Sequence, residues 1–203
     1  IQAYRYAAEP FFFDQQHSVD APKIYARMLH VFFAFVMFVF LGVALCIDVF
    51  KYFIPNSAYW VGLDIVPILL LANVFLGVYF NLSVWYKLTD NTKYGSYIAI
   101  FGALATVALN IALIPIFGFR GSAWATLICH FSMAALSYYF GQKHLRVPYD
   151  LKKLSAYFFL AIGFFALNQW LPLQNATAQW FIRGLMIFFF AFCFLYFEFI
   201  KPH

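Results

Sequence analysis

The side chains in this sequence that could do chemistry are a few ionic and polar residues set within long apolar runs. Arg5 and Glu9 stand four residues apart in the opening stretch IQAYRYAAEPFFF, so on a helix they share a face and can form an ion pair. Arg183 lies near the start of the last apolar run. These groups lie either at a membrane interface or in a polar cavity, and the interface is the favoured alternative for both.

Files of small and polar residues recur at intervals of four along the apolar runs. The first two files are Asn73, Gly77 and Asn81 in one run, and Gly102, Thr106 and Asn110 in the next. Such files are typical of faces on which membrane helices approach closely, because lipid provides no hydrophobic drive for helix association. They can also line a solvated path, but helix packing is the favoured interpretation.

His130 lies near the middle of a further file, with Ser122, Thr126, Ala134 and Ser137. An ionisable side chain at that depth should face protein or a water-filled cavity. The favoured role is a neutral, hydrogen-bonded structural histidine. As the general base of an intramembrane transferase it would need a second polar group within hydrogen-bond reach. No such partner is visible in the sequence, so the transferase is the weakest alternative.

The elements that must position these side chains are membrane-spanning helices. The chain has 203 residues, 65% of them hydrophobic, 24% aromatic and only 10% charged, whereas soluble domains contain about 25% charged residues. This composition excludes an ordinary soluble domain. Residues 94–141 hold two runs joined by Gly118-Phe119-Arg120-Gly121. Since about 20 apolar residues cross the hydrocarbon of a bilayer, this stretch predicts a tight hairpin of two spanning helices.

The whole sequence predicts an all-α, polytopic transmembrane bundle of six full spans, preceded by the end of another span at residues 1–13. The six runs are residues 31–53, 60–86, 94–119, 121–141, 154–171 and 178–199. By alternation, ten of the 13 basic residues fall on one side of the membrane and only Lys51, Arg120 and Arg183 on the other. The positive-inside rule predicts that the richer side is cytoplasmic.

Several kinds of chemistry have no motif in this sequence. It contains no Walker loop, no GxGxxG, no HExxH and no nucleophile with clustered carboxylates. Cys46, Cys129 and Cys193 are far from any CxxC or Cys/His metal spacing. The net charge of +5 is spread between the apolar runs rather than gathered in one patch. We therefore expect no enzyme, no cofactor, no metal site and no nucleic-acid partner.

One stretch resembles a known family. Residues 108–126, ALNIALIPIFGFRGSAWAT, are similar to the hairpin N-x-x-L-I-P-x-x-G-x-x-G-A-A-x-A-T of polysaccharide flippases in the multidrug/oligosaccharidyl-lipid/polysaccharide exporter superfamily. Ser122 stands where that pattern has a small apolar residue. The opening AYRYAAEPFFF is similar to the end of the second helix of the C-terminal lobe in bacterial O-antigen and capsule flippases.

The resemblance implies a second half of a two-lobed protein. Residues 1–141 would be the second transport lobe, incomplete at its N-terminus, residues 142–153 a basic cytoplasmic loop, and residues 154–203 two additional transmembrane helices. Such proteins flip undecaprenyl-pyrophosphate-linked oligosaccharide across the bacterial inner membrane by alternating access, for lipopolysaccharide and other polysaccharide biosynthesis. The implied partners are this lipid-linked oligosaccharide, membrane lipid and the first half of the polypeptide, and a coupling cation is left open.

The implied cavity has to attract a pyrophosphate, for which the bidentate fork of an arginine is well suited. Arg5 is the leading candidate and Arg183 the second. The full set of cavity candidates is Arg5, Glu9, Asn73, Asn81, Asn110, His130 and Arg183. The alternative within the superfamily is a cation-coupled multidrug exporter. Its cavity should be acidic, and Glu9, Asp48 and Asp64 are the carboxylates near membrane depth.

Overall fold

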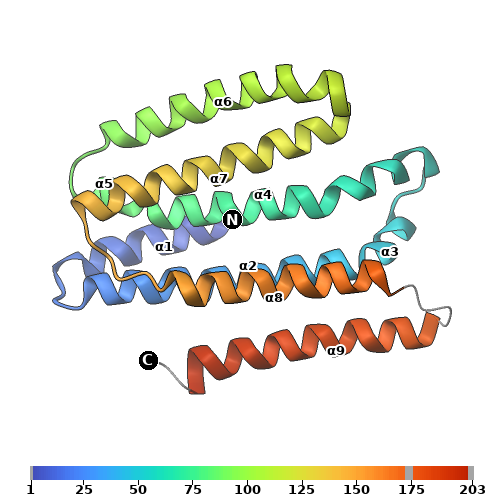
Figure 1. Ribbon diagram of the computed structural model, residues 1–203. Coiled ribbons are helices and arrows are strands. Elements are labelled where there is room, and N and C mark those ends of the chain that lie inside the picture. Colours follow the sequence, from blue (N-terminus) through green and yellow to red (C-terminus); the bar gives the residue numbers. More distant parts are fainter. Residues whose placement is uncertain (1, 172–175, 201–203) are drawn as a thin grey trace. The chain divides into compact units, whose positions relative to one another are not determined.

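The computed structural model describes residues 2–171 and 176–200, and over these residues the chain is 89% helical with no strand. The expected all-α class is confirmed. Figure 1 shows the helices, which we name in chain order. They are α1 (Gln2–Asp14), η1 (Gln15–His17), α2 (Ala21–Leu45), α3 (Ile47–Phe50), η2 (Lys51–Phe53), η3 (Ser57–Ile65), α4 (Val66–Leu82), α5 (Val84–Leu88), α6 (Lys93–Phe117), α7 (Phe119–His144), α8 (Leu151–Trp170), α9 (Ala176–Leu195) and the π-helical turn η4 (Tyr196–Ile200).

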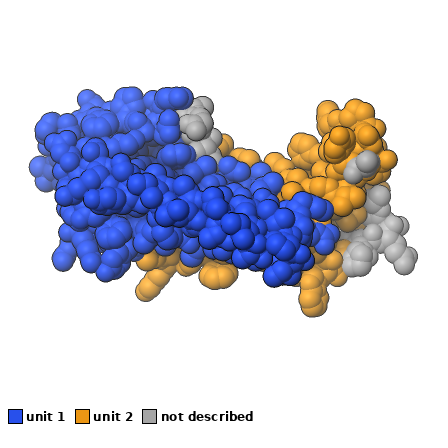
Figure 2. Space-filling view, turned by 90° about the horizontal axis from the view of Figure 1, so that it is seen from above, with its two compact units in different colours: residues 1–29, 68–149 blue, residues 30–67, 150–203 orange. Residues whose placement is uncertain are grey.

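The described residues form two compact units, coloured separately in Figure 2. Unit 1 comprises residues 1–29 and 68–149, and unit 2 comprises residues 30–67 and 150–203. The boundaries fall inside α2 and α4, so both helices contribute residues to each unit. These units reflect packing and do not test the expected division into a lobe, a basic loop and two terminal helices.

Five helical segments among the described residues are long and apolar enough to cross a membrane. They are Ala21–Leu45, Tyr59–Leu88, Lys93–Phe117, Leu151–Trp170 and Thr177–Glu198. Helix α7, with 26 residues, also has sufficient length, but serine, threonine and histidine side chains interrupt its apolar residues. The chain is therefore a multi-pass membrane protein, and the count of six full spans stays a prediction.

The connection between α6 and α7 is shorter than the sequence analysis expected. Helix α7 begins at Phe119, so Gly118 alone joins the two helices, which run side by side (Figure 1). Gly118 has φ of 60° and ψ of −139°, a conformation that side chains with a Cβ atom rarely adopt. Its N–H donates to the Ile114 carbonyl at 2.8 Å, and the Gly121 N–H donates to the Gly118 carbonyl at 3.0 Å. These bonds satisfy backbone groups that a helix end leaves open.

Small residues allow α6 and α7 to approach closely, as predicted. A Cβ atom added at Gly102 would lie 2.5 Å from the Met133 sulfur. Thr106 Oγ1 lies 3.1 Å from the Cys129 sulfur across the interface. The packing interpretation is thus confirmed for Gly102 and Thr106. Elsewhere α6 exposes large apolar side chains, namely Tyr97, Ile100, Leu104, Val107 and Ile111, which suits contact with lipid acyl chains.

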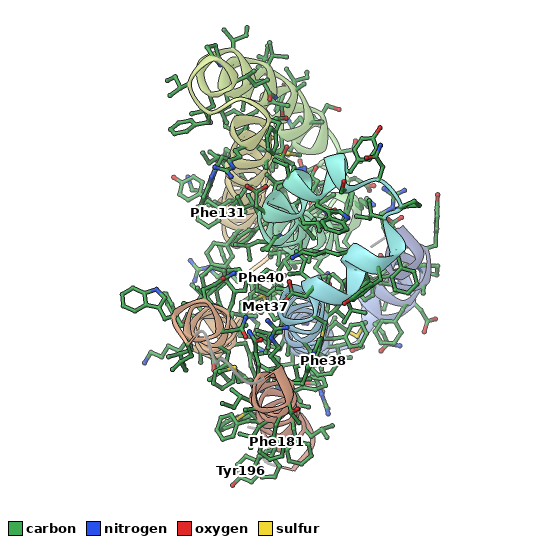
Figure 3. All side chains as sticks on the ribbon, turned by 90° about the vertical axis from the view of Figure 1, so that its right-hand side faces the viewer. Met37, Phe38, Phe40, Phe131, Phe181 and Tyr196 are labelled. Carbon is green, nitrogen blue, oxygen red and sulfur yellow. The ribbon has the colours of Figure 1, made fainter. Side chains whose placement is uncertain are left out.

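Aromatic side chains hold α2 against α8 and α9 in unit 2. The Phe38 ring of α2 stacks on the Phe190 ring of α9 with centroids 6.5 Å apart, and Figure 3 shows Phe38 on the side of α2 toward α9. Phe40 meets Phe165 of α8 at 6.1 Å. Met37 of α2 is fully buried. Ring contacts of this kind add to the burial of apolar area that holds the helices together.

Two helix boundaries differ from the sequence expectation. Helix α2 begins at Ala21 rather than at residue 31, because Pro22 lies in the first turn, where proline does not break a helix. It ends at Leu45 rather than at residue 53.

Within residues 142–153 only 145–150 lie outside helices. The Asp150 carboxylate caps α8 by accepting from the N–H groups of Lys152 and Lys153, each at 3.0 Å. The Lys153 N–H contributes most to holding the pKa of Asp150 below its ordinary value.

Gly118→Ala tests the single-residue joint. An alanine forced into this backbone conformation should lower the free energy of unfolding by about 1–3 kcal/mol, measured by circular dichroism in detergent. Gly163→Ala is the control, because a Cβ atom there meets nothing within 4 Å and φ is not positive. It should cause no loss of stability. Equal effects of the two variants would contradict the assigned joint.

Candidate functional site

Arg5 and Glu9 lie in unit 1, where α1 contacts α5. The Arg5 Nε atom is 3.6 Å from Glu9 Oε1, and the Lys87 Nζ atom is 2.6 Å from the same oxygen. We call these three residues the Glu9 triad. Their side chains are 31%, 33% and 28% exposed, in the order Arg5, Glu9 and Lys87. The predicted pairing of Arg5 with Glu9 is confirmed, and Lys87 is a member that sequence reasoning missed.

Within the Glu9 triad, Lys87 is the stronger partner of the carboxylate. A separation of 3.6 Å is too long for a hydrogen bond, so Arg5 interacts with Glu9 through charge alone. The Arg5 guanidinium carbon instead lies 5.1 Å from the ring centroid of Phe80 and 5.4 Å from that of Tyr6. Cation–π contacts of this kind hold the guanidinium plane while leaving its N–H edge able to donate.

Hydrogen bonds to other helices fix the position of α1. Tyr4 donates its hydroxyl to Asn81 Oδ1 of α4 at 2.7 Å. Tyr25 of α2 donates to the Phe12 carbonyl near the end of α1 at 3.1 Å. The Asn81 amide also donates to the Gly77 carbonyl at 3.1 Å, so this predicted cavity residue serves helix packing. Because α1 is tied at both ends, Arg5 and Glu9 have a defined position against α5.

The remaining candidates of unit 1 are bonded to backbone carbonyls. The Asn73 amide donates to Leu69 and the Asn110 amide to Thr106, each at 2.8 Å within its own helix. Asn110 Oδ1 is buried with no hydrogen-bond partner in the described part of the chain. His130 Nδ1 lies 3.0 Å from the Ala72 carbonyl. Since a carbonyl only accepts, this nitrogen carries a proton and the histidine has the structural bond that the sequence analysis favoured.

Arg183, the second arginine candidate, lies in unit 2 and is buried at 5% exposure. It donates to Asp48 Oδ2 and to Asn168 Oδ1, each at 3.0 Å, and its guanidinium lies 5.1 Å from the Trp180 ring. Protein groups therefore hold Arg183, and one of them is Asp48, which lies beyond the end of the span Ala21–Leu45. The expectation that Arg183 extends to the interface stays a prediction. The seven sequence candidates thus belong to several places: Arg5, Glu9 and Asn81 around α1, the others on α4, α6, α7 and α9.

The Asp48 carboxylate pairs with a cation at each of its two oxygens. The Lys51 Nζ atom lies 3.1 Å from Asp48 Oδ1, three residues along the chain, and Arg183 occupies the other oxygen. Burial raises the pKa of the Asp48 carboxyl, but the hydrogen bonds and charges of Lys51 and Arg183 outweigh burial and hold the pKa below its ordinary value. The carboxylate is therefore a fixed link between α3 and α9.

Sequence reasoning also missed a buried carboxylate in unit 2. Glu198, in the π-helical turn η4, is only 3% exposed and accepts from the Lys153 Nζ at 2.8 Å and the Tyr157 hydroxyl at 3.1 Å. Close by, His30 Nε2 accepts the Asp150 N–H at 3.1 Å. The available signal was the spacing of four between Lys153 and Tyr157, which places both on one face of α8.

Neither a metal centre nor a disulfide is formed by the described residues. Over residues 2–171 and 176–200, no group of three or more His, Cys, Asp and Glu side chains could hold a metal ion. Cys46, Cys129 and Cys193 are all free thiols. The ionic groups described above are cations held near partly exposed or buried carboxylates.

Lys153→Ala tests the buried carboxylate of unit 2. Removing the charged donor leaves Glu198 with only the Tyr157 hydroxyl, which should lower the free energy of unfolding by about 1–3 kcal/mol. The measurement is thermal unfolding in detergent at neutral pH. Lys152→Ala changes the neighbouring exposed lysine and should shift the midpoint little. Similar shifts for the two variants would show that the Glu198 contact does not stabilise unit 2.

Acid unfolding tests the Asp48 link. Because the pKa of Asp48 is lower in the folded than in the unfolded state, its stabilisation is present above the unfolded pKa and is lost as the pH falls through the folded pKa. Asp48→Asn should therefore reduce the fall in unfolding temperature between pH of about 5 and about 3. Asp20→Asn, in the exposed pair with Lys23, is the control. An unchanged fall in Asp48→Asn would contradict the link.

The chain was also compared with known proteins. Comparison with protein-family models, with curated protein sequences and with solved structures gave no significant match. The functional inference therefore depends on the ionic groups and on the apolar helices that carry them.

Proposed function

We propose that this protein is a transmembrane flippase that moves undecaprenyl-pyrophosphate-linked oligosaccharide across the bacterial inner membrane for polysaccharide biosynthesis. The observation that carries this proposal is the state of Arg5. Its guanidinium is partly exposed, lies over the Phe80 ring and is only loosely paired with Glu9 at 3.6 Å. An arginine in an apolar helical protein with unused hydrogen-bond donors is suited to a phosphate group.

The energetics of a lipid-linked anion support this choice. A diphosphate cannot enter an apolar bundle unless cations replace part of its hydration. Arg5 and Lys87 bring two positive charges to the Glu9 triad against one carboxylate, so the group has a net charge of +1. The exposed apolar side chains of α6 provide the kind of surface that a polyprenyl tail can follow.

The two alternatives have weaker support. A cation-coupled drug exporter needs carboxylates that are available to cations, but two of the three named for it already pair with cations: Glu9 with Arg5 and Lys87, and Asp48 with Lys51 and Arg183. An intramembrane transferase based on His130 needs a second catalytic group, and the bond of this histidine to the Ala72 carbonyl is that of a structural residue. We therefore retain the flippase as the proposed function.

Arg5→Ala and Arg5→Glu test the proposal in the intact protein, expressed in bacteria that lack their own flippase for the same glycan. Both variants should reduce glycan export at least about tenfold, because a charge-assisted phosphate contact is lost. Arg5→Lys should retain part of the activity, since it keeps the charge but not the fork.

Arg27→Ala is the matched control, because this arginine of unit 1 is exposed and should export normally. Abundance in the membrane is measured for every variant. Normal export by Arg5→Ala and Arg5→Glu at equal abundance would show that the phosphate contact is wrong. Drug resistance conferred by the intact protein, with no glycan export, would favour the multidrug exporter instead.

A further inference from the structure

We propose that Glu9 is an internal counter-ion that occupies a diphosphate site formed by Arg5 and Lys87, and that the diphosphate of a lipid carrier displaces it. This inference rests on the proposed function. It goes further by adding Lys87 as a second ligand and by assigning to Glu9 the role of a competitor for the site.

The geometry of the Glu9 triad places one oxygen between two cations. Glu9 Oε1 is 2.6 Å from the Lys87 Nζ and 3.6 Å from the Arg5 Nε. The two cations come from different helices, Arg5 from α1 and Lys87 from α5. Glu9 and Lys87 are 78 residues apart in the sequence. A phosphate oxygen at the same position would accept from the Lys87 ammonium and interact with the Arg5 guanidinium through charge, because both groups bind carboxylate and phosphate oxygens in the same way.

The energetics favour exchange of the carboxylate for a diphosphate. Arg5, Glu9 and Lys87 are each about a third exposed, and ion pairs that water can reach contribute little to stability. Releasing Glu9 therefore costs little. A diphosphate offers more acceptor oxygens and more negative charge than one carboxylate, so it can engage the fork of Arg5 and the ammonium of Lys87 together.

The turn of α1 that carries Glu9 has fewer helical hydrogen bonds than a regular turn, whereas the Arg5 guanidinium is held in place. Pro10 lies inside α1 and has no N–H to donate to the carbonyl of Tyr6, so the turn that carries Glu9 lacks one helical hydrogen bond. By contrast, Arg5 is held over the Phe80 ring at 5.1 Å. Tyr4, next to Arg5, is bonded to Asn81 at 2.7 Å.

Binding measurements on the whole chain in lipid nanodiscs test this inference. The probes are inorganic pyrophosphate, farnesyl diphosphate and farnesol, titrated by calorimetry at neutral pH. Glu9→Gln should bind both diphosphates about tenfold more tightly, because the competing charge is removed. Lys87→Gln should bind them about tenfold more weakly, while Lys87→Arg should stay within about threefold of the unchanged protein.

The exposed pair of Lys23 with Asp20, 2.9 Å apart in unit 1, supplies matched controls. Asp20→Asn and Lys23→Gln make the same charge changes as Glu9→Gln and Lys87→Gln, so they should leave diphosphate affinity unchanged if the effect is local. Thermal unfolding of each variant shows whether it is folded. If Lys87→Gln does not fold, the diphosphate affinity of Lys87→Arg is compared with that of Glu9→Gln instead.

The outcomes separate this inference from the proposed function. Unchanged or weaker diphosphate binding by Glu9→Gln overturns the counter-ion role. If Arg5→Ala loses binding while Glu9→Gln and Lys87→Gln bind normally, the inference fails and the proposed phosphate contact stands. If the unchanged protein binds neither diphosphate, both fail. Binding of farnesol as tight as that of farnesyl diphosphate would show recognition of the tail alone, which also overturns the inference.

Discussion

The structure depends on one constraint: a charged side chain that leaves water inside an apolar helical protein must find a partner. Glu9 has Arg5 and Lys87, Asp48 has Lys51 and Arg183, and Glu198 has Lys153 with the Tyr157 hydroxyl. Each of these groups joins at least two helices. The scarce ionic residues of this chain therefore act as specific links between helices, in addition to the contact area that its many apolar side chains provide.

The three links differ in how readily they can be opened. Arg183 and Glu198 are almost completely buried, so breaking either ion pair would leave a buried charge without its opposite charge. The Glu9 triad is about a third exposed, and its Arg5 is held by aromatic rings rather than by the carboxylate. Buried links suit a structural role. A partly exposed link with an excess of positive charge suits exchange with an anion, which is why the functional proposals concern α1 and α5.

Local sequence patterns determined the features that depend on residues close together in the chain. The apolar runs required helices, because a helix satisfies its own backbone hydrogen bonds in lipid. Spacings of three and four placed Asp48 with Lys51 and Arg5 with Glu9 on shared helix faces. Gly102 indicated a close helix contact, and Gly118 indicated the end of a helix. The predicted length of the hairpin joint and the predicted start of α2 were less accurate, since helix ends depend on capping bonds that the sequence pattern does not define.

Only the tertiary structure decided which helices exchange ionic contacts. Lys87 and Glu9 are 78 residues apart, and Arg183 and Asp48 are 135 apart. The sequence determined that this protein is an all-helical membrane protein and which residues share a helix face. It could not determine the rotation and depth of one helix against another, because these result from packing of side chains along the whole interface. That packing buried Arg183 against Asp48 and brought Lys87 to Glu9.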